Sequence, residues 1–168
     1  MRPIFWMALA TLVYGCGGGG GGTSDPAGTG GTLPFPATLA SIQEKVFSPT
    51  CAQGCHEPGG EGVINTGISG GTPLDLSSTV DSFSSLVNVE STIDDICGAT
   101  LTEFGASPCG DRVEPGEPDR SWLIVKLEGT HERIGREAGD RMPRSGPLLT
   151  QDEIDVIRQW IEEGAQNN

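Results

Sequence analysis

The sequence has few of the side chains on which acid–base enzymes depend, and little basic charge. It contains 2 His and 1 Tyr, so few groups titrate near neutral pH. Its 10 Lys and Arg oppose 23 Asp and Glu, which leaves a net charge of -13. No basic cluster is available to neutralise phosphates, and this excludes a nucleic-acid partner. No apolar run approaches the ~20 residues of a spanning helix, which excludes a multispanning membrane protein.

Hydrophobic residues make up 35% of the chain and aromatic residues 5%, whereas Gly and Pro number 26 and 12. Such a composition predicts one small domain with long irregular connections. No alternating strand pattern is long enough to indicate a sheet. We therefore expect a mainly α fold with long Gly/Pro-rich loops.

The first 15 residues have the layout of a secretory signal. Arg2 supplies a positive start, an apolar run covers Ile4 to Val13, and small Gly15 precedes Cys16. This region resembles the lipobox of bacterial lipoproteins, which implies that Cys16 is lipidated and becomes the new N-terminus. The alternative is an ordinary secretory signal with Cys16 unmodified.

An unbroken glycine run follows Cys16, from Gly17 to Gly22, and the chain stays rich in Gly, Ser and Thr to Thr32. This composition is typical of a flexible tether. We divide the chain into a lipoprotein signal peptide (1–15), a Gly-rich tether (16–37) and a folded domain (38–168).

Apolar periodicity predicts a first helix from about residue 37 to Phe47. Ser41 and Glu44 have the spacing of a capping box, and Pro49 is expected to end the helix.

Three further helices are expected. A short one covers Thr79–Val87, and another runs from Pro118 to Gly129. The last begins after a capping box formed by Thr150 and Glu153, and Gly164 is placed to end it.

Besides Cys16, the chain has Cys51, Cys55, Cys97 and Cys109. An even set in an exported chain first suggests two disulfides. However, His56 follows Cys55, so the stretch reads C-x3-C-H, one residue longer than the C-x2-C-H of haem attachment. In such a motif two thiols bind the haem vinyl groups and the histidine lies under the iron.

Other interpretations of the cysteines stay open. One alternative is a disulfide between Cys51 and Cys55, with His56 as a surface residue that has no role. For Cys97 and Cys109 we expect a structural disulfide. The chain-entropy model predicts that closing a loop of this length stabilises the protein by roughly 3 kcal/mol. A metal site at Cys97 and Cys109 is the alternative, although no histidine lies near them in sequence.

From Thr38 to Ala165 the sequence resembles the cytochrome c-like domains of exported bacterial lipoproteins, a subset of which carry C-x3-C-H. The segments that carry this resemblance are Val46–Cys51, the Cys51–His56 motif, Leu74–Ser77, Leu86–Val89, Val113–Asp119, Ser121–Leu123, Lys126–Leu127, Arg141–Pro143 and Ile157–Ile161.

The resemblance implies a small helical domain around a covalent haem c, with His56 and Met142 as the axial iron ligands. Met142 precedes Pro143, and it is the only methionine outside the signal segment. The alternative is that Met142 fills a gap in the core. His131 lies in a charged stretch that we interpret as a solvated loop rather than as a source of a haem ligand.

The residues expected to surround the haem are Phe47, Phe83, Leu123, Ile157 and Trp160. Arg141 and Arg144 are candidates to pair with the haem propionates, with solvent exposure as the alternative.

The function implied is single-electron transfer in the cell envelope, not enzymatic catalysis. The acidic surface favours redox partners with a basic docking patch. A lipid anchor would hold the protein on the periplasmic side or at the outer membrane. The alternatives are a haem-free, disulfide-stabilised surface lipoprotein that acts as a binding module, and a weak peroxidase formed if Met142 leaves the iron.

Overall fold

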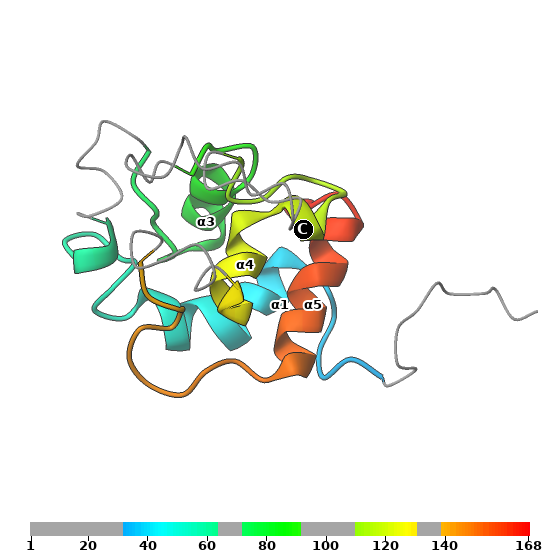
Figure 1. Cartoon of the computed structure of the whole chain (residues 1–168), viewed down its shortest axis with the longest axis horizontal. Coiled ribbons are helices and arrows are strands. Elements are labelled where there is room, and N and C mark those ends of the chain that lie inside the picture. The colour runs from blue at the N-terminus through cyan, green and yellow to red at the C-terminus, as the bar shows by residue number, and fades with distance from the viewer. Residues whose placement is uncertain (1–31, 64–71, 92–109, 131–138) are drawn as a thin grey trace, which may run out of the picture. The chain divides into compact units, whose positions relative to one another are not determined.

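The computed structural model describes residues 32–63, 72–91, 110–130 and 139–168 (Figure 1), which fall within one compact unit that starts at Thr32. In these four ranges the regular structure is helical and there is no strand. Two isolated β-bridges, Val87 to Val113 and Glu90 to Asp111, join the end of one helix to a later loop. The described part thus agrees with a mainly α fold. None of its helices has the length and apolar character needed to cross a membrane.

The first helix differs from the expectation at both ends. The α-helix α1 covers Leu39–Ile42, and its N-cap is Thr38, whose side chain accepts a hydrogen bond from the Ser41 backbone N–H. The expected capping role of Ser41 is therefore wrong. The cap lies three residues earlier, where Thr38 has an extended backbone and its hydroxyl also donates to Ser41 Oγ at 3.0 Å.

The same helix also continues beyond the proline that was expected to stop it. α1 runs directly into a π-helix, η1, which covers Gln43–Ala52 and contains Pro49. Proline cannot donate to the preceding turn and crowds the carbonyl behind it. A π-turn, with its i→i+5 hydrogen bonds, is wider than an α-turn and accommodates both effects. The helical chain therefore reaches Cys51 instead of ending at Phe47.

Helix α3 (Thr79–Leu86) agrees with the prediction and is capped by Ser78. The helix expected from Pro118 is interrupted: the 3₁₀-helix η2 covers Pro118–Arg120 and α4 covers Trp122–Glu128. Ser121 separates the two with an extended backbone, and its hydroxyl accepts from the Glu114 N–H at 2.9 Å. This local side-chain bond competes with helix continuation.

Helix α5 (Gln151–Glu162) confirms the predicted capping box between Thr150 and Glu153. Gly164 follows the helix with a φ of 97°, a conformation that favours glycine.

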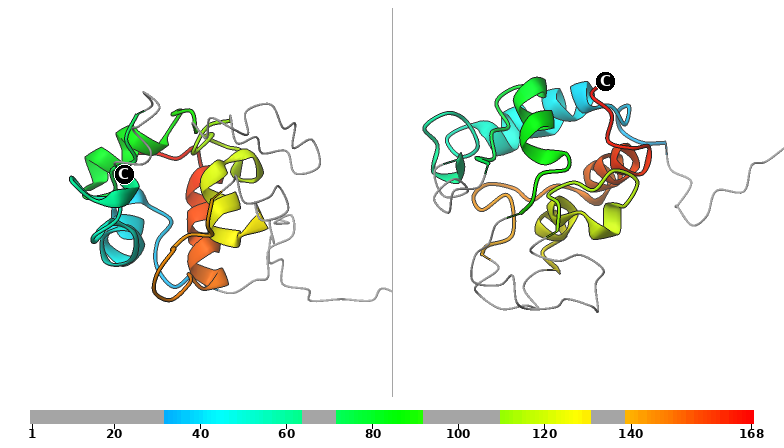
Figure 2. Two further views of the ribbon diagram at one scale, coloured as in Figure 1. Left: turned by 60° about the vertical axis from the view of Figure 1, so that its left-hand side comes forward. Right: turned by 90° about the horizontal axis from the view of Figure 1, so that it is seen from above.

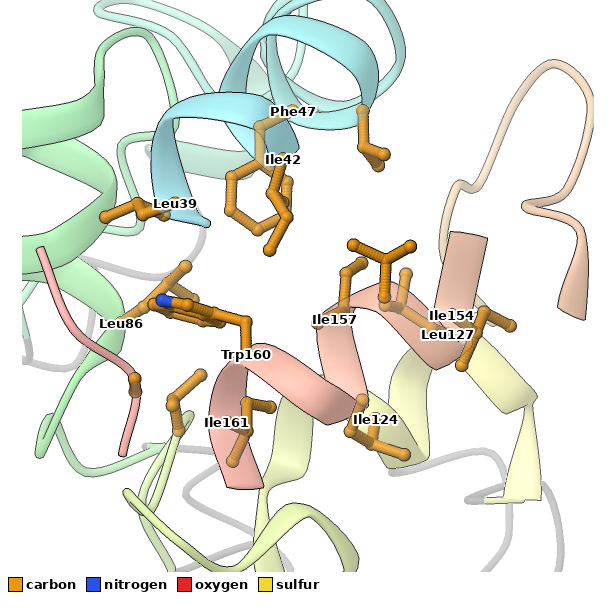
Figure 3. Packing of buried hydrophobic residues seen from close by; sticks show 14 of the residues in the cluster. Leu39, Ile42, Phe47, Leu86, Ile124, Leu127, Ile154, Ile157, Trp160 and Ile161 are labelled. Atoms are coloured by element: carbon orange, nitrogen blue, oxygen red, sulfur yellow. The ribbon is translucent and has the colours of Figure 1, made fainter. Parts of the chain in front are cut away.

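The core joins these helices through large apolar side chains. In Figure 3, Ile42 and Phe47 from α1 and η1 point towards Ile157 and Trp160 of α5. All four are at most 1% exposed. Leu33, Phe35 and Ala37 also pack against this core, so packing begins within the range assigned to the tether.

Candidate functional site

The two cysteines of the C-x3-C-H motif lie where η1 ends. Cys51 is in its last turn, and the chain then turns so that the Cys55 N–H donates to Ala52 O at 3.0 Å and the His56 N–H donates to Cys51 O at 3.1 Å. Gly54 has a φ of 71°, which permits the tight reversal. This nested pair of hydrogen bonds accommodates the extra residue of the motif while it keeps Cys51, Cys55 and His56 together.

Both thiols are half-buried and neither is in a disulfide. Burial, and secondarily the charge of Cys55, raises the pKa of Cys51 to about 12. Cys51 is therefore a neutral thiol at neutral pH.

The His56 ring is oriented by a backbone carbonyl. Its Nδ1 lies 3.2 Å from Leu74 O, and the His56 carbonyl accepts from the Leu76 N–H at 2.7 Å. A carbonyl can only accept, so this contact places the ring proton on Nδ1 and leaves the lone pair on Nε2. An imidazole held in this way could bind a metal ion through Nε2.

The electrostatics of His56 also favour the neutral ring that metal binding requires. Burial lowers the pKa of His56 most, and the positive charge of Arg112 lowers it further. The hydrogen bond to Leu74 and the charge of Asp75 act in the opposite direction. The net shift is downward, so the lone pair is available at neutral pH.

Two glycines allow the chain after the motif to fold back against it. A Cβ added at Gly60 would lie 2.2 Å from Cys55 O, and one added at Gly62 would lie 2.6 Å from both Nδ1 and Cε1 of His56. The Gly62 N–H also donates to Cys55 O at 3.0 Å. Only glycine therefore fits here, and its backbone forms one wall beside the histidine ring.

We expect Gly62→Ala to push the His56 ring away from Leu74 and to destabilise the protein by about 1–3 kcal/mol, the usual range for overpacking. Urea unfolding would measure the stability, and the chemical shifts of the His56 ring nitrogens would report its displacement. Gly59→Ala is the control, because a Cβ there meets nothing within 4 Å and carries only the strain of a φ of 86°. If Gly59→Ala moves the His56 signals as much as Gly62→Ala does, the steric explanation fails.

Residues 72–76, which we call the histidine strap, are held along most of their length. The Leu74 carbonyl faces His56, the Asp75 carbonyl accepts from Ser85 Oγ at 2.7 Å, and the Leu76 carbonyl accepts from Gln43 Nε2 at 2.8 Å. Gln43 is 6% exposed and lies in η1. The position of Leu74 O, and with it that of the ring, is thus fixed by two helices.

Met142 is positioned from the end of α4. Its N–H donates to Lys126 O at 3.0 Å, and Arg141 Nε donates to Leu127 O at 2.9 Å. Gly129 makes room for Arg141, since a Cβ there would lie 2.7 Å from its Cδ. The chain at Arg141 and Met142 is therefore held against the end of α4.

The expected haem surroundings lie in one cluster with part of the motif. Phe47, Ile157 and Trp160 are buried in the core. The partly buried residues that pack against it include Cys51, Phe83, Leu123 and Met142. Figure 1 and the right view of Figure 2 show the orange segment that carries Met142 on the same side of the unit as residues 53–63.

The two arginines expected near the propionates have other partners. Arg141 donates to the α4 carbonyl already described, and Arg144 pairs with Asp140 at 2.9 Å with both side chains mostly exposed. The predictions for Cys16, Cys97, Cys109 and His131 lie outside the described residues.

Sequence reasoning missed the residues that orient His56. The segment Leu74–Ser77 is part of the family resemblance, but the contact of the Leu74 carbonyl with His56 leaves no pattern in the sequence. Gly60 and Gly62 were two glycines among 26. Arg112 was not singled out either, and its place between Asp111 and Val113 carries no pattern that would mark it.

No group of three or more His, Cys, Asp or Glu side chains suited to a metal ion occurs within the ranges that the structure describes. Comparison of the chain with protein-family models, with curated proteins and with solved structures finds no match.

Proposed function

We propose that the chain is a membrane-anchored c-type cytochrome that transfers single electrons in the cell envelope through a haem ligated by His56 and Met142. The observation that carries this proposal is the local geometry of the motif. Two unpaired thiols and an imidazole with its Nε2 free are held together by one turn. A covalent haem needs this set of groups.

When bound, haem c supplies an iron that changes oxidation state by one electron. Cys51 and Cys55 would hold the ring edge as thioethers, and His56 would present Nε2 while Leu74 O retains the Nδ1 proton. Met142 would present its sulfur from a loop anchored on α4. If His56 and Met142 both bound the iron, the chain would leave no site on it for a substrate, which favours an electron carrier over a peroxidase.

The apolar core around the motif has a second role. Phe47, Ile157 and Trp160 are at most 1% exposed. Such side chains exclude water, and a dry pocket together with a thioether ligand raises the reduction potential. The net charge of -13 favours partners with a basic docking patch and makes the encounter rate sensitive to salt.

A redox titration followed by visible absorption tests this function. We expect a reversible one-electron transition with a positive potential, and docking rates that fall as salt increases. The alternative of a haem-free surface lipoprotein predicts a protein with no visible absorption.

The proposed anchor gives a prediction of its own. Cys16→Ser should release the protein into the soluble fraction, because the thioether that carries the lipid cannot form at serine. Fractionation of cells that express the parent or the variant measures this. An unchanged distribution and unchanged gel mobility of the variant would show that Cys16 is not lipidated.

A further inference from the structure

Arg112 is a buried cation that the proposed function has not used. It is 5% exposed, and its Nη1 donates to Ser85 O at 2.7 Å while its Nη2 donates to Thr72 O. No ion pair joins it to a carboxylate in the described parts of the chain. Burial lowers the pKa of Arg112, but a guanidinium starts so high that it stays charged at neutral pH.

The backbone of Arg112 is fixed as firmly as its side chain. Its N–H donates to Val89 O at 2.7 Å, and its neighbours Asp111 and Val113 form the two β-bridges to the chain after α3. The guanidinium therefore has little freedom to turn towards solvent. Burying a cation is unfavourable unless it is paired with an anion, so a role in the site would explain the position of Arg112.

The two carbonyls that Arg112 binds join α3 to the histidine strap. Thr72 is the first residue of the strap, and Ser85, whose hydroxyl holds Asp75 O, lies in α3. Arg112 thus completes the set of bonds that fixes the strap, and the strap fixes the His56 ring through Leu74 O.

The charge of Arg112 also lies close to the segment that contacts the ring. Its Nη2 donates to Thr72 O, two residues before Leu74, whose carbonyl faces His56 Nδ1. This positive charge would act on an iron bound to His56 Nε2, where the ferric state carries one more positive charge than the ferrous state. It would favour the reduced state, and little salt screening is expected for a buried charge.

We propose that Arg112 is a positioning residue of the haem site, which fixes the strap that orients His56 and raises the reduction potential through its buried positive charge. This inference rests on the proposed function. It adds Arg112, which follows His56 by 56 positions in the sequence, to the groups that set the reduction potential.

The test compares Arg112→Gln, which removes the charge and keeps a donor, with Arg112→Lys, which keeps the charge. We expect Arg112→Gln to shift the redox equilibrium about tenfold towards the oxidised form, or about 59 mV downward for one electron. Arg112→Lys should stay close to the parent. The control is Arg120→Gln, which removes the charge of an exposed arginine paired with Glu114.

Measurements at low and high salt sharpen the comparison. The shift of Arg112→Gln should persist at high salt, whereas any effect of Arg120→Gln should disappear. If the haem protein forms and Arg112→Gln matches Arg120→Gln, the role of Arg112 is refuted while the proposed function stands.

A parent protein without haem would instead refute the proposed function, and a second measurement then tests the strap in the haem-free protein. The ring-nitrogen NMR shifts of His56 should show one tautomer, protonated at Nδ1, in the parent. In Arg112→Met, which has no donor for Thr72 or Ser85, they should show a mixture. Identical His56 shifts in the two proteins would overturn the positioning role.

Discussion

Met142→Ala is expected to keep its haem, lose its high reduction potential and bind carbon monoxide. The covalent attachment depends on Cys51 and Cys55, which the change does not touch. Loss of the thioether removes the ligand that favours ferrous iron, so the potential should fall by at least ~0.1 V, within the ~0.8 V that axial ligands span. A redox titration and a carbon monoxide difference spectrum measure the two effects.

Two variants serve as controls for this prediction. Met142→His should also lower the potential but keep the sixth position closed, so carbon monoxide should not bind. His131→Ala should change neither the spectrum nor the potential. If His131→Ala alters the spectrum and the potential while Met142→Ala leaves them unchanged, His131 and not Met142 is the ligand. If neither variant changes them, another group occupies the sixth position.

The second large effect is expected from replacing both thiols of the motif. The double variant Cys51→Ser, Cys55→Ser should carry no covalent haem, because a hydroxyl does not form the thioether bond. Acid–acetone extraction should remove all colour from the polypeptide, whereas each single variant should retain haem through its remaining thiol. Absorption of the extracted polypeptide measures the difference.

The matched control is Cys97→Ser, Cys109→Ser, which removes two thiols without altering the motif. Its covalent haem should equal that of the parent, even if its stability falls by the roughly 3 kcal/mol that a disulfide of this loop length contributes. Equal haem loss in the two double variants would show that the effect comes from misfolding instead of attachment.

The sequence predicted best the elements whose signals are local. The capping box of Thr150 and Glu153 lies at the start of α5 itself, so capping chemistry within a short stretch suffices to place this helix. The short helix over residues 79–86 was also predicted, since its apolar positions lie close together in sequence.

The predicted helix boundaries were wrong where a longer-range or less common interaction outweighs a local rule. Pro49 normally ends a helix, yet a π-turn accommodates it and the helix continues to the C-x3-C-H motif. Ser121 interrupts an apparently continuous helix because its hydroxyl bonds to Glu114.

For the candidate site, the sequence placed Cys51, Cys55 and His56 in one motif, but it did not reveal what orients the histidine. The contact of His56 with Leu74 O spans 18 positions, and Arg112 binds Thr72 across 40. Such contacts depend on how the chain returns on itself, for which composition and spacing contain no signal. The proposed place of Met142 over the iron stays a prediction.

The central claim is tested most directly by the mass of the purified parent protein, exported in a strain with haem-attachment machinery. The account predicts that the polypeptide is heavier than its bare mass by one haem and that this mass survives denaturation and acid–acetone extraction. It also predicts that neither Cys51 nor Cys55 reacts with a thiol reagent. A colourless protein of bare mass, with Cys51 and Cys55 joined by a disulfide, would contradict it.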